Sequence, residues 1–459
     1  MKTLWLTVFC VLGILGVSAP VLSGAAGIAA DDTAGRTGYD GWLVVAFSGE
    51  ENGYLEPCGC EKTKIGGIAR RDGMFLLLNR GNQTILPLSL GDLSGHVKRQ
   101  DEIKTETLVQ ALGDMQYELH NIGERDLEMG PEALSYFFLS SPVKLLSSNV
   151  VLSDVPGLTI HPYVVRTVRA GDGEVKVGVL GILSPNVLET VLRGVEITPP
   201  SEAIAPLLKE MGDVDLLILL SHADLAESVK LAESFPEFQL VVSGHRETEP
   251  TVVNVGNTVV AACGNRGMNV GLFYYRPDGA ETRLEMVELG ERYQESSRML
   301  DLLDSYQQRL RDENLLGRVE KYPYDGGAAY AGNVICGACH QETFLHWKTT
   351  GHALAHETLE MVAHDYDPEC VACHVTGLYY ESGFTSREQT PGLKGVGCES
   401  CHGPGSMHVA AAEKGIKGDG YGKVEPRDCD TCHDIEHSSQ FRYKDYWERI
   451  VHPEERPKG

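Results

Sequence analysis

Four copies of the string Cys-x-x-Cys-His lie near the C-terminal end of the chain. Two cysteines at this spacing can add across the vinyl groups of one haem, and the histidine that follows can bind the iron. Random placement of 12 cysteines and 16 histidines in 459 residues would give about 0.01 such strings per chain. We therefore predict four c-type haems, attached through Cys336, Cys339 and His340, Cys370, Cys373 and His374, Cys398, Cys401 and His402, and Cys429, Cys432 and His433.

Paired cysteines have two other common uses, in structural zinc sites and in disulfides. Zinc ribbons rarely place a histidine directly after every second cysteine, and their two halves are usually closer in sequence. Haem attachment is therefore favoured over both alternatives. Four iron centres within one short region of the chain indicate electron transfer.

The iron of such a haem takes a second axial ligand, and a neutral imidazole is the usual one. Beyond the four motif histidines, the same region contains seven more. These candidates are His346, His352, His356, His364, His408, His437 and His452.

The residues around the first and third motifs resemble a known family. Trp347 and the string Thr350-Gly-His352, together with the segment Gly397–His408, are similar to the tetrahaem cytochromes c that accept electrons from hydroxylamine oxidoreductase in nitrifiers. What this resemblance implies is distal haem ligands at His346, His352 and His408, and a five-coordinate haem with an open face at His374.

The start of the chain has the pattern of a signal peptide. Lys2 precedes an apolar stretch from Leu4 to Leu22, which is followed by small residues and then by Asp31. This order predicts that residues 1–30 are removed on export. The apolar run also approaches the length of a membrane span, so a retained anchor is the alternative. We expect a periplasmic or extracellular protein with no stable membrane span after cleavage.

The composition limits the partners. The formal net charge is −25 at pH 7, which argues against nucleic acid and acidic membranes and favours basic partners. A hydrophobic content of 42% is ample for globular cores, and a length of 459 residues suggests two or three domains.

Short apolar runs alternate with helical segments between residues 40 and 290, as is typical of α/β architecture. Each run ends in polar or glycine-containing turns, where α/β proteins place their ligand groups. The predicted strands are Trp42–Phe47, Thr84–Leu88, Lys144–Ser148, Lys176–Leu180, Leu216–Leu220, Leu240–Val242 and Thr258–Ala262.

The residue composition of the sequence changes after this domain. A helix from Tyr293 to Leu316 and a linker rich in small residues are expected within residues 291–331. Residues 332–450 have few β-branched runs and many Cys, His, Gly and Lys. They predict a mostly α-helical or irregular multihaem domain, in which haem rings supply the apolar core. The tail, residues 451–459, is expected to fray.

A series of short strings in the N-terminal domain follows the order found in a second family. The strings are Asn52–Pro57, Gly66–Arg70, Gly91-Asp92, Gly123–Asp126, Ser148–Val150, Ser221-His222 and Ser243–His245. Together they resemble the secreted 5′-nucleotidase branch of the calcineurin-like metallophosphoesterases. This resemblance implies a β-sandwich flanked by helices, and two metals that position a phosphoryl group and an attacking water.

The metal-ligand set implied by this second family is incomplete in the chain. Arg125 stands where the family has a catalytic histidine, and it puts a fixed positive charge where a metal-bound phosphate is polarised. The other replaced positions are Glu50 for Asp, Asn52 for His, Glu124 for Asn and Glu247 for His, whereas Asp92, His222 and His245 remain.

Three hypotheses are compatible with this rewritten set. The one we favour is a retained fold whose hydrolytic chemistry is lost. A second is a residual site for one divalent cation, formed by Glu50, Asp92, Glu124, His222 and His245. A third is an active metal-dependent phosphoesterase.

Cys58 and Cys60 lie in the loop where the second family begins its metal site. A Cys-x-Cys pair can close a tight disulfide, hold a soft metal or act in redox chemistry. Related secreted metallophosphoesterase-like proteins with Pro-Cys-Gly-Cys in this loop favour the redox-active or metal-holding pair. Because Cys10 falls in the signal peptide, Cys263 is the third cysteine not claimed by haem.

Together these features predict an exported tetrahaem c-type cytochrome that carries electrons between a redox protein donor and a redox protein acceptor. The N-terminal domain is expected to serve in docking or assembly, with homo-oligomers or complexes with other multihaem proteins left open. The alternative function is a multihaem reductase or oxidoreductase acting on a small nitrogen or sulfur species. Its candidate catalytic sites are the open face of the His374 haem and the cleft at Cys58 and Cys60.

Overall fold

Alternate residues of the first strand, β1 (Leu43–Ser48), pack into two different cores. Val44 and Ala46 belong to one buried cluster, whereas Leu43, Val45 and Phe47 belong to another. Because successive side chains of a strand point to opposite faces, a strand that is apolar at every position needs a packed layer on each side. The local sequence therefore requires a layered domain.

The computed structural model describes residues 41–57, 64–81, 83–153, 155–190, 192–416, 422, 424–434, 437–438 and 440–452. The predicted signal peptide, residues 1–30, and the pair Cys58 and Cys60 lie outside the described residues. Within this described part, every helix is too short or too polar to cross a bilayer.

The first sheet has seven strands among the described residues. Strand β1 pairs in parallel with β2 on one side and antiparallel with β14 on the other. In spatial order the strands are β15 (Thr282–Glu288), β14 (Asn269–Tyr275), β1, β2 (Thr84–Ser89), β3 (Leu119–Asn121), β4 (Lys144–Leu146) and β6 (Ile160–His161).

The second sheet has six strands in the same described part, and a separate pair joins β5 (Val150–Leu152) to β9 (Val195–Ile197). Val177 and Ile218 of the second sheet pack against Val45 and Phe47 of the first, so the sheets face each other across a buried core. In spatial order the strands of the second sheet are β12 (Thr251–Val255), β13 (Thr258–Ala262), β11 (Leu240–Gly244), β10 (Leu216–His222), β8 (Gly173–Leu183) and β7 (Tyr163–Ala170).

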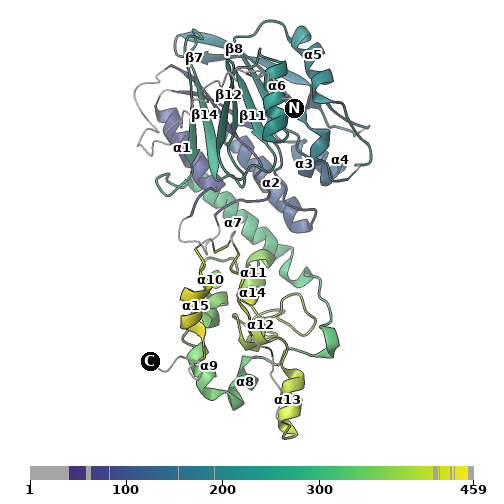
Figure 1. Ribbon diagram of the computed structural model, residues 1–459, viewed down its shortest axis with the longest axis vertical. Helices are drawn as coiled ribbons and strands as arrows, with labels where there is room; N and C mark the ends of the chain where they lie inside the picture. The colour runs from purple at the N-terminus through teal and green to yellow at the C-terminus, as the bar shows by residue number, and fades with distance from the viewer. Residues whose placement is uncertain are drawn as a thin grey trace, which may run out of the picture. The chain divides into compact units, whose positions relative to one another are not determined.

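Helices cover the outer faces of both sheets (Figure 1). Those packed on the first sheet contribute residues such as Leu78, Leu112 and Leu303 to its outer core, and those on the second contribute Ile204 and Leu231. The β-sandwich flanked by helices that the sequence predicted is therefore confirmed. The helices are α1 (Ile68–Arg80), α2 (Arg99–Asp114), α3 (Glu124–Glu128), α4 (Pro131–Phe138) and α7 (Ser297–Asp312) beside the first sheet, α5 (Pro200–Met211) and α6 (Leu225–Ser234) beside the second, and the 3-10 turn η1 (Pro185–Val187).

Helix α7 lies in the stretch where the sequence predicts a connecting helix, but it is shorter than expected. It begins after Ser296, whose backbone is extended, and it is followed by Asn314, whose φ is 51°. An asparagine in the left-handed region is a common way to end a helix. Helix α7 lies alongside α1 and α2, and residues 34–459 form one compact unit.

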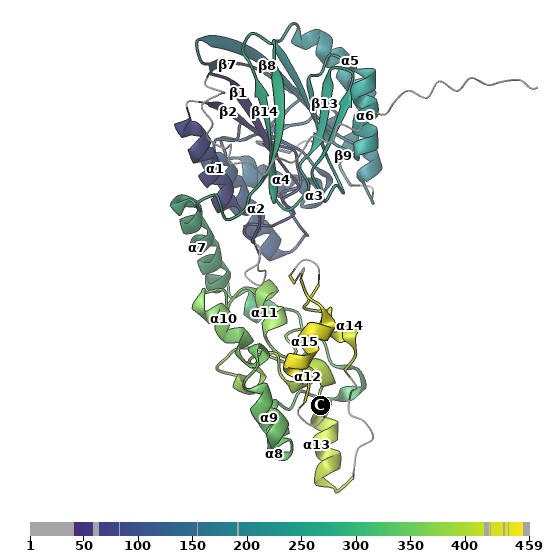
Figure 2. The same ribbon diagram turned by 60° about the vertical axis from the view of Figure 1, so that its left-hand side comes forward.

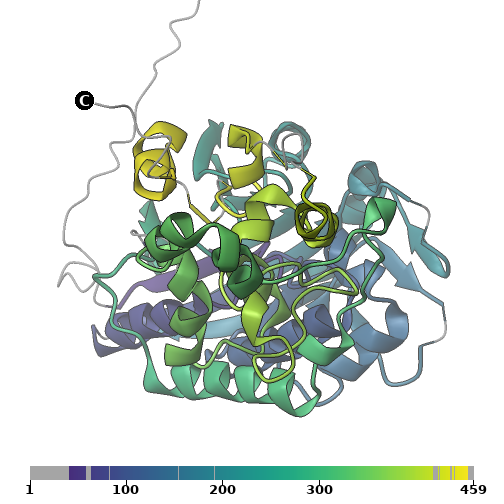
Figure 3. The same ribbon diagram turned by 90° about the horizontal axis from the view of Figure 1, so that it is seen from below.

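The region after α7 consists of short helices that run in different directions (Figure 3). Its buried apolar cluster is small and includes Leu316, Val371 and Phe384. The helical C-terminal region predicted from the sequence is thus confirmed. Its elements are η2 (Leu316–Arg318), η3 (Asp325–Gly327), α8 (Asn333–Cys339), α9 (Gln341–Trp347), η4 (Gly351–Leu354), α10 (Ala355–Met361), α11 (Pro368–His374), η5 (Pro391–Leu393), α12 (Cys398–His402), α13 (Ser406–Glu413), α14 (Pro426–Cys429) and α15 (Tyr443–Ile450).

Candidate functional site

The haem motifs lie on short helices. The first ends α8, the second ends α11 and the third occupies α12, whereas the fourth begins at the end of α14. Residues three apart on a helix lie on one face, so the two cysteines of a motif point to the same side. This is the arrangement that attachment to a single haem requires.

The motifs meet in pairs. Cys336 in the first motif lies beside Cys398 in the third, where α8 contacts α12. Cys432 in the fourth motif likewise lies beside Cys373 in the second. Attachment points that are far apart in the sequence are therefore neighbours in space, first with third and second with fourth.

Hydrogen bonds orient the motif histidines. Nδ1 of His374 lies 2.6 Å from the carbonyl oxygen of Ala355, and Nδ1 of His402 lies 2.8 Å from that of Gly422. A carbonyl oxygen can only accept, so Nδ1 carries the proton and Nε2 keeps its lone pair. This is the usual state of a metal-binding histidine whose other nitrogen is held by the protein.

Three motif histidines face a second histidine. Imidazole nitrogens that bind one metal from opposite sides need ring centres about 6 Å apart, because each metal–nitrogen bond is about 2 Å long. The observed separations meet this condition, so the residues present fit haem iron. The pairs are His340 with His408 at 6.2 Å, His352 with His433 at 6.1 Å and His402 with His452 at 5.7 Å.

The structure thus places His352 and His408 opposite motif histidines, and it adds His452. His346 lies on α9, and its role as an axial ligand stays a prediction. His356 is instead buried in the small apolar core, where its ring lies 5.4 Å from that of Phe384. No sequence pattern singled out His452, because it lies beyond the strings that carry the cytochrome resemblance.

A second cluster lies in the N-terminal domain, at the carboxyl ends of parallel strands. α/β proteins place their ligand groups at this edge because the strand ends of one sheet converge there. All five residues that the sequence proposed for a residual cation site come together here. They are Glu50 after β1, Asp92 after β2, Glu124 at the start of α3, His222 at the end of β10 and His245 after β11.

The backbone at this edge adopts conformations that side chains rarely take. The φ angles of Glu50, Asn52 and Asp92 are 53°, 51° and 57°, and that of His245 is 140°. Residues held in the left-handed region are strained and often lie at functional sites. The loops are therefore shaped to aim these side chains.

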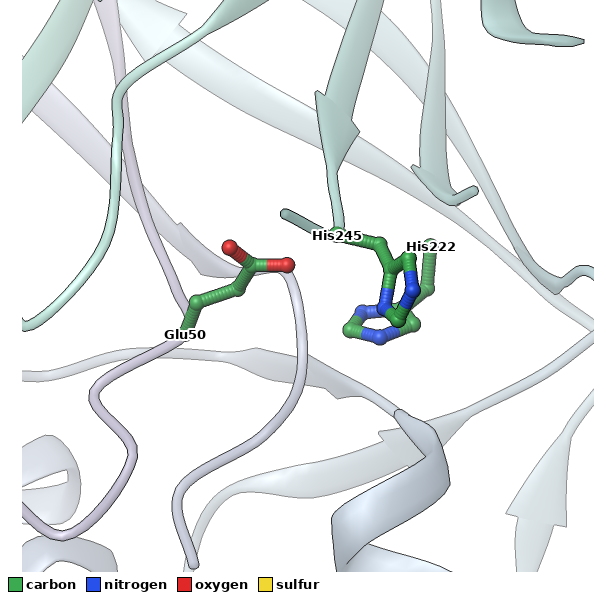
Figure 4. Close-up of side chains that lie close together, drawn as sticks. All are labelled: Glu50, His222 and His245. Atoms are coloured by element: carbon green, nitrogen blue, oxygen red, sulfur yellow. The ribbon is translucent and has the colours of Figure 1, made fainter. Parts of the chain in front are cut away.

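The carboxylate of Glu124 bridges His222 and His245. Nε2 of His222 lies 3.4 Å from Oδ2 of Asp92 and also contacts Glu124, whose other oxygen lies 3.0 Å from Nδ1 of His245. Figure 4 shows the carboxylate of Glu50 pointing toward the two imidazoles. Potential ligand atoms of Glu50, His222 and His245 lie within 4.8 Å of one another, and so do those of Asp92, Glu124 and His222.

Burial and crowded charge shift the pKa values of the cluster. Burial raises the pKa of Glu50 to about 8 and that of Asp92 to about 6, although His222 opposes both shifts. Burial disfavours a charged His222, but the neighbouring Asp92 and Glu124 outweigh it and raise the pKa of this histidine well above its usual value. A divalent cation bound among these three buried carboxylates and two imidazoles would favour the ionised carboxylates and the neutral histidines, which are the forms that bind metal.

The residues fit one cation and do not fit two. Nδ2 of Asn52 is turned to the backbone oxygen of Glu50, at 3.0 Å. Arg125 donates to the carbonyl of Gly95 at 2.6 Å, and its Nε lies 4.0 Å from Oδ2 of Asp92. Glu247 lines a separate surface groove beside α6. Three positions where the resemblance implies histidines therefore hold an amide turned to the backbone, a guanidinium and a carboxylate that faces another groove.

Residues 335–403 match the family model of cytochrome c554 and c-prime. Cytochrome c-554 of Nitrosomonas europaea is 41% identical over 93 residues, which cover 17% of this chain and 40% of that protein. The C-terminal region therefore carries a cytochrome c554-like domain, as the sequence predicted, and such a domain is that of a c-type cytochrome with covalently bound haem.

The N-terminal domain matches phosphoesterases. Protein 5NUC of Lutzomyia longipalpis is 26% identical over 199 residues, covering 41% of this chain and 35% of that protein. The structure of a 5′-nucleotidase precursor from Thermus thermophilus superposes with a TM-score of 0.52 at 23% identity and covers 59% of each chain. These matches show the fold of the domain. The chain spans about two fifths or less of the length of these two curated relatives, 40% and 35%.

Asp126 binds the backbone of the two loops that carry Asp92 and Glu124. The sequence did not predict this role. Its carboxylate accepts the backbone N–H groups of Asp92 at 2.9 Å, Leu93 at 3.0 Å and Gly123 at 2.9 Å. His120, which is fully buried, contacts the same carboxylate at 3.0 Å. Asp126 thereby fastens the loop of Asp92 to the loop of Glu124. Its place inside the string Gly123–Asp126 was the one available signal.

Proposed function

We propose that this protein is an exported tetrahaem c-type cytochrome that carries electrons between redox proteins in the periplasm or outside the cell. The strongest support comes from three pairs of histidines, each made of one motif histidine and one other histidine. Their ring centres lie 5.7–6.2 Å apart. When bound, the haems supply the redox centres. The chain attaches, orients and ligates them.

In this proposal His408 serves the iron bound by His340, and His352 serves the iron bound by His433. His452 serves the iron bound by His402. Two histidines on one iron leave no position for a substrate, so these three sites favour electron transfer over catalysis. The resemblance to the nitrifier cytochromes leaves the His374 haem as the candidate for an open face, and a reductase activity would reside there.

The contacts between motifs support a continuous electron path. Cys336 and Cys398 bring the first and third motifs together, and Cys373 and Cys432 bring the second and fourth together. Electrons would pass within each pair of haems and then between the pairs. Redox proteins with basic surfaces are the expected donor and acceptor, because the chain has a formal net charge of −25.

Two measurements test this proposal. A pyridine haemochrome assay and the intact mass should give four haems per chain, and fewer would contradict it. His452→Met should alter the low-spin electron paramagnetic resonance signal of one haem, whereas the matched variant His346→Met should leave that signal unchanged. The opposite result would make His346 the third distal ligand and overturn our assignment.

We also propose that the N-terminal domain binds one divalent cation and does not hydrolyse phosphate esters. Mixed imidazole and carboxylate ligands suit Zn²⁺, Mn²⁺ or Fe²⁺ better than Ca²⁺. Glu50, Asp92, Glu124, His222 and His245 would hold the ion, and Arg125 would occupy the space where a substrate phosphate is polarised. Isothermal titration of the full-length holoprotein with Zn²⁺ or Mn²⁺ should give a stoichiometry of one, and two ions would contradict the proposal.

A further inference from the structure

The segment just before the second haem motif, residues 364–369, is held by side chains from the N-terminal part of the chain. It leads into α11, the helix that carries Cys370, Cys373 and His374. Its contacts come from α2, from α7 and from the loop that contains Glu56. Figure 2 shows α7 extending from α1 and α2 toward α10 and α11. All of these contacts lie within the single compact unit of residues 34–459.

Asp367 is the centre of this contact. Its carboxylate accepts a hydrogen bond from Nε2 of Gln100 on α2 at 2.8 Å, and Gln307 on α7 donates a second at 3.3 Å. Gln100 also donates to the hydroxyl of Tyr306 at 2.9 Å. The four residues are between 4% and 8% exposed. Water cannot easily replace hydrogen bonds to a carboxylate buried this deeply, so the contact is specific.

The same carboxylate caps the haem helix. Oδ1 of Asp367 accepts the backbone N–H of Glu369 at 3.0 Å, as an N-cap aspartate does. Helix α11 has seven residues, which correspond to a length of about 10 Å. Fixing the first turn of so short a helix fixes the direction in which its last residue, His374, leaves it. One side chain therefore joins the N-terminal domain to the position of this haem ligand.

Charged contacts surround Asp367. Lys104 lies one helical turn after Gln100 on α2, so both residues lie on the face of α2 that contacts the haem region. The guanidinium of Arg311 also lies 4.5 Å from the ring centre of Tyr366. The ion pairs are Lys104 with Glu369 and Arg311 with Asp365 at 3.4 Å, and Nε2 of His364 lies 3.6 Å from a carboxylate oxygen of Glu56.

The third motif is anchored in a different way. Glu399 on α12 is 1% exposed, and its carboxylate accepts three backbone N–H groups. These belong to Ala331 at 2.8 Å, Gly332 at 2.7 Å and Gly405 at 2.6 Å, which lie in the haem region or directly before it. A buried carboxylate thus holds each helix, but that of α11 is bound by the N-terminal domain and α7.

We propose that the N-terminal domain positions the second haem through Asp367. Gln100 and Gln307 act as positioning residues that fix α11, the direction of His374 and the redox potential of the haem bound there. The proposal rests on the tetrahaem function given above. In this proposal the phosphoesterase-like domain holds one of the four haems in position.

The test uses full-length holoprotein with Gln100→Ala and Gln307→Ala combined. Gln110→Ala is the matched control, because Gln110 lies exposed on the same helix. Loss of both side-chain hydrogen bonds should make amide exchange in residues 367–374 about tenfold faster, with little change in residues 398–402. In a redox titration followed by paramagnetic resonance, one haem potential should shift and three should stay.

A charge exchange at the ion pair of Lys104 and Glu369 gives a second test. The side chain of Lys104 is 13% exposed and that of Glu369 is 54% exposed. Lys104→Glu should move the same potential, and Lys104→Glu combined with Glu369→Lys should restore most of it. Restoration would not follow from a general loss of stability, so it supports positioning.

Two results would overturn the proposal. One is unchanged exchange and unchanged potentials in the double glutamine variant, and the other is an equal shift of all four potentials. Neither result touches the proposed function, which depends on a haem count of four in the parent protein. A lower count would instead remove the proposed function, whatever the glutamine variants do.

Discussion

The N-terminal domain and the haem region differ in what fills their interiors. The first has three buried clusters made of its own side chains, inside and outside its two sheets. The second has one small cluster and four Cys-x-x-Cys-His motifs that we predict to attach haem. A domain with a complete apolar core can fold by itself, whereas a region with a small one needs covalent or metal support. The comparison predicts that a substitution in one region changes the stability of that region and leaves the other region folded.

The largest effect is expected from blocking haem attachment. Cys398→Ala combined with Cys401→Ala should remove one haem and open the haem region, because α12 then loses its covalent support. The N-terminal domain should keep its fold. Limited proteolysis with mass spectrometry would show new cleavage in residues 332–450 and none in residues 64–290. Equal protection of both regions would show that the haem region folds without its full set of haems.

Truncation in the core between the sheets should be the next largest effect. Ile218 is fully buried between the two sheets, and Ile218→Ala should lower the free energy of unfolding of the N-terminal domain by about 2–5 kcal/mol. The haem absorption spectrum should not change. Ile218→Val is the matched control, with an expected loss of about 0.5–1.5 kcal/mol. Chemical denaturation followed separately by fluorescence and by haem absorbance would measure both, and a haem transition that moves with Ile218→Ala would end the distinction between the regions.

A smaller and more local effect is expected at the cation cluster. Glu124 contacts both His222 and His245, so Glu124→Gln should weaken Zn²⁺ binding by at least about tenfold. The haem potentials should stay where they are. Glu233→Gln, at an exposed position on α6, is the control that should bind normally. An equal loss in both variants would show that the cluster does not hold the ion.

The smallest effect is expected in a hydrolysis assay. With Mn²⁺ or Zn²⁺ present, the holoprotein should release phosphate from nucleoside monophosphates at the background rate, because Nε of Arg125 lies 4.0 Å from Oδ2 of Asp92, at the position where the resemblance implies a catalytic histidine. Arg125→His should not restore activity, because Asn52 and Glu247 still stand where the resemblance implies histidines. Turnover well above background in the parent protein would make the N-terminal domain an enzyme.

Much of the fold followed from local pattern. Each of the seven predicted strands coincides with an observed one, because buried parallel strands are continuous apolar runs. The sequence reasoning missed other strands, among them β14, which pairs with β1 after the chain returns from more than 200 residues away, and β15, which pairs with β14. It also missed Asp126 and Asp367. Both are ordinary acidic residues in sequence, and only burial and hydrogen bonding mark them out.

The sequence by itself determined the covalent chemistry, since two cysteines and a histidine at fixed spacing act on one haem without help from the rest of the chain. Tertiary structure decided everything that depends on distant partners. It placed His452 across from His402, brought four strand ends and the start of α3 together in the cation cluster, and joined Gln100 to Asp367. The physical reason is that an axial ligand, a cation site and a buried hydrogen bond each need atoms within a few ångströms, and chain folding alone brings residues from separate elements that close.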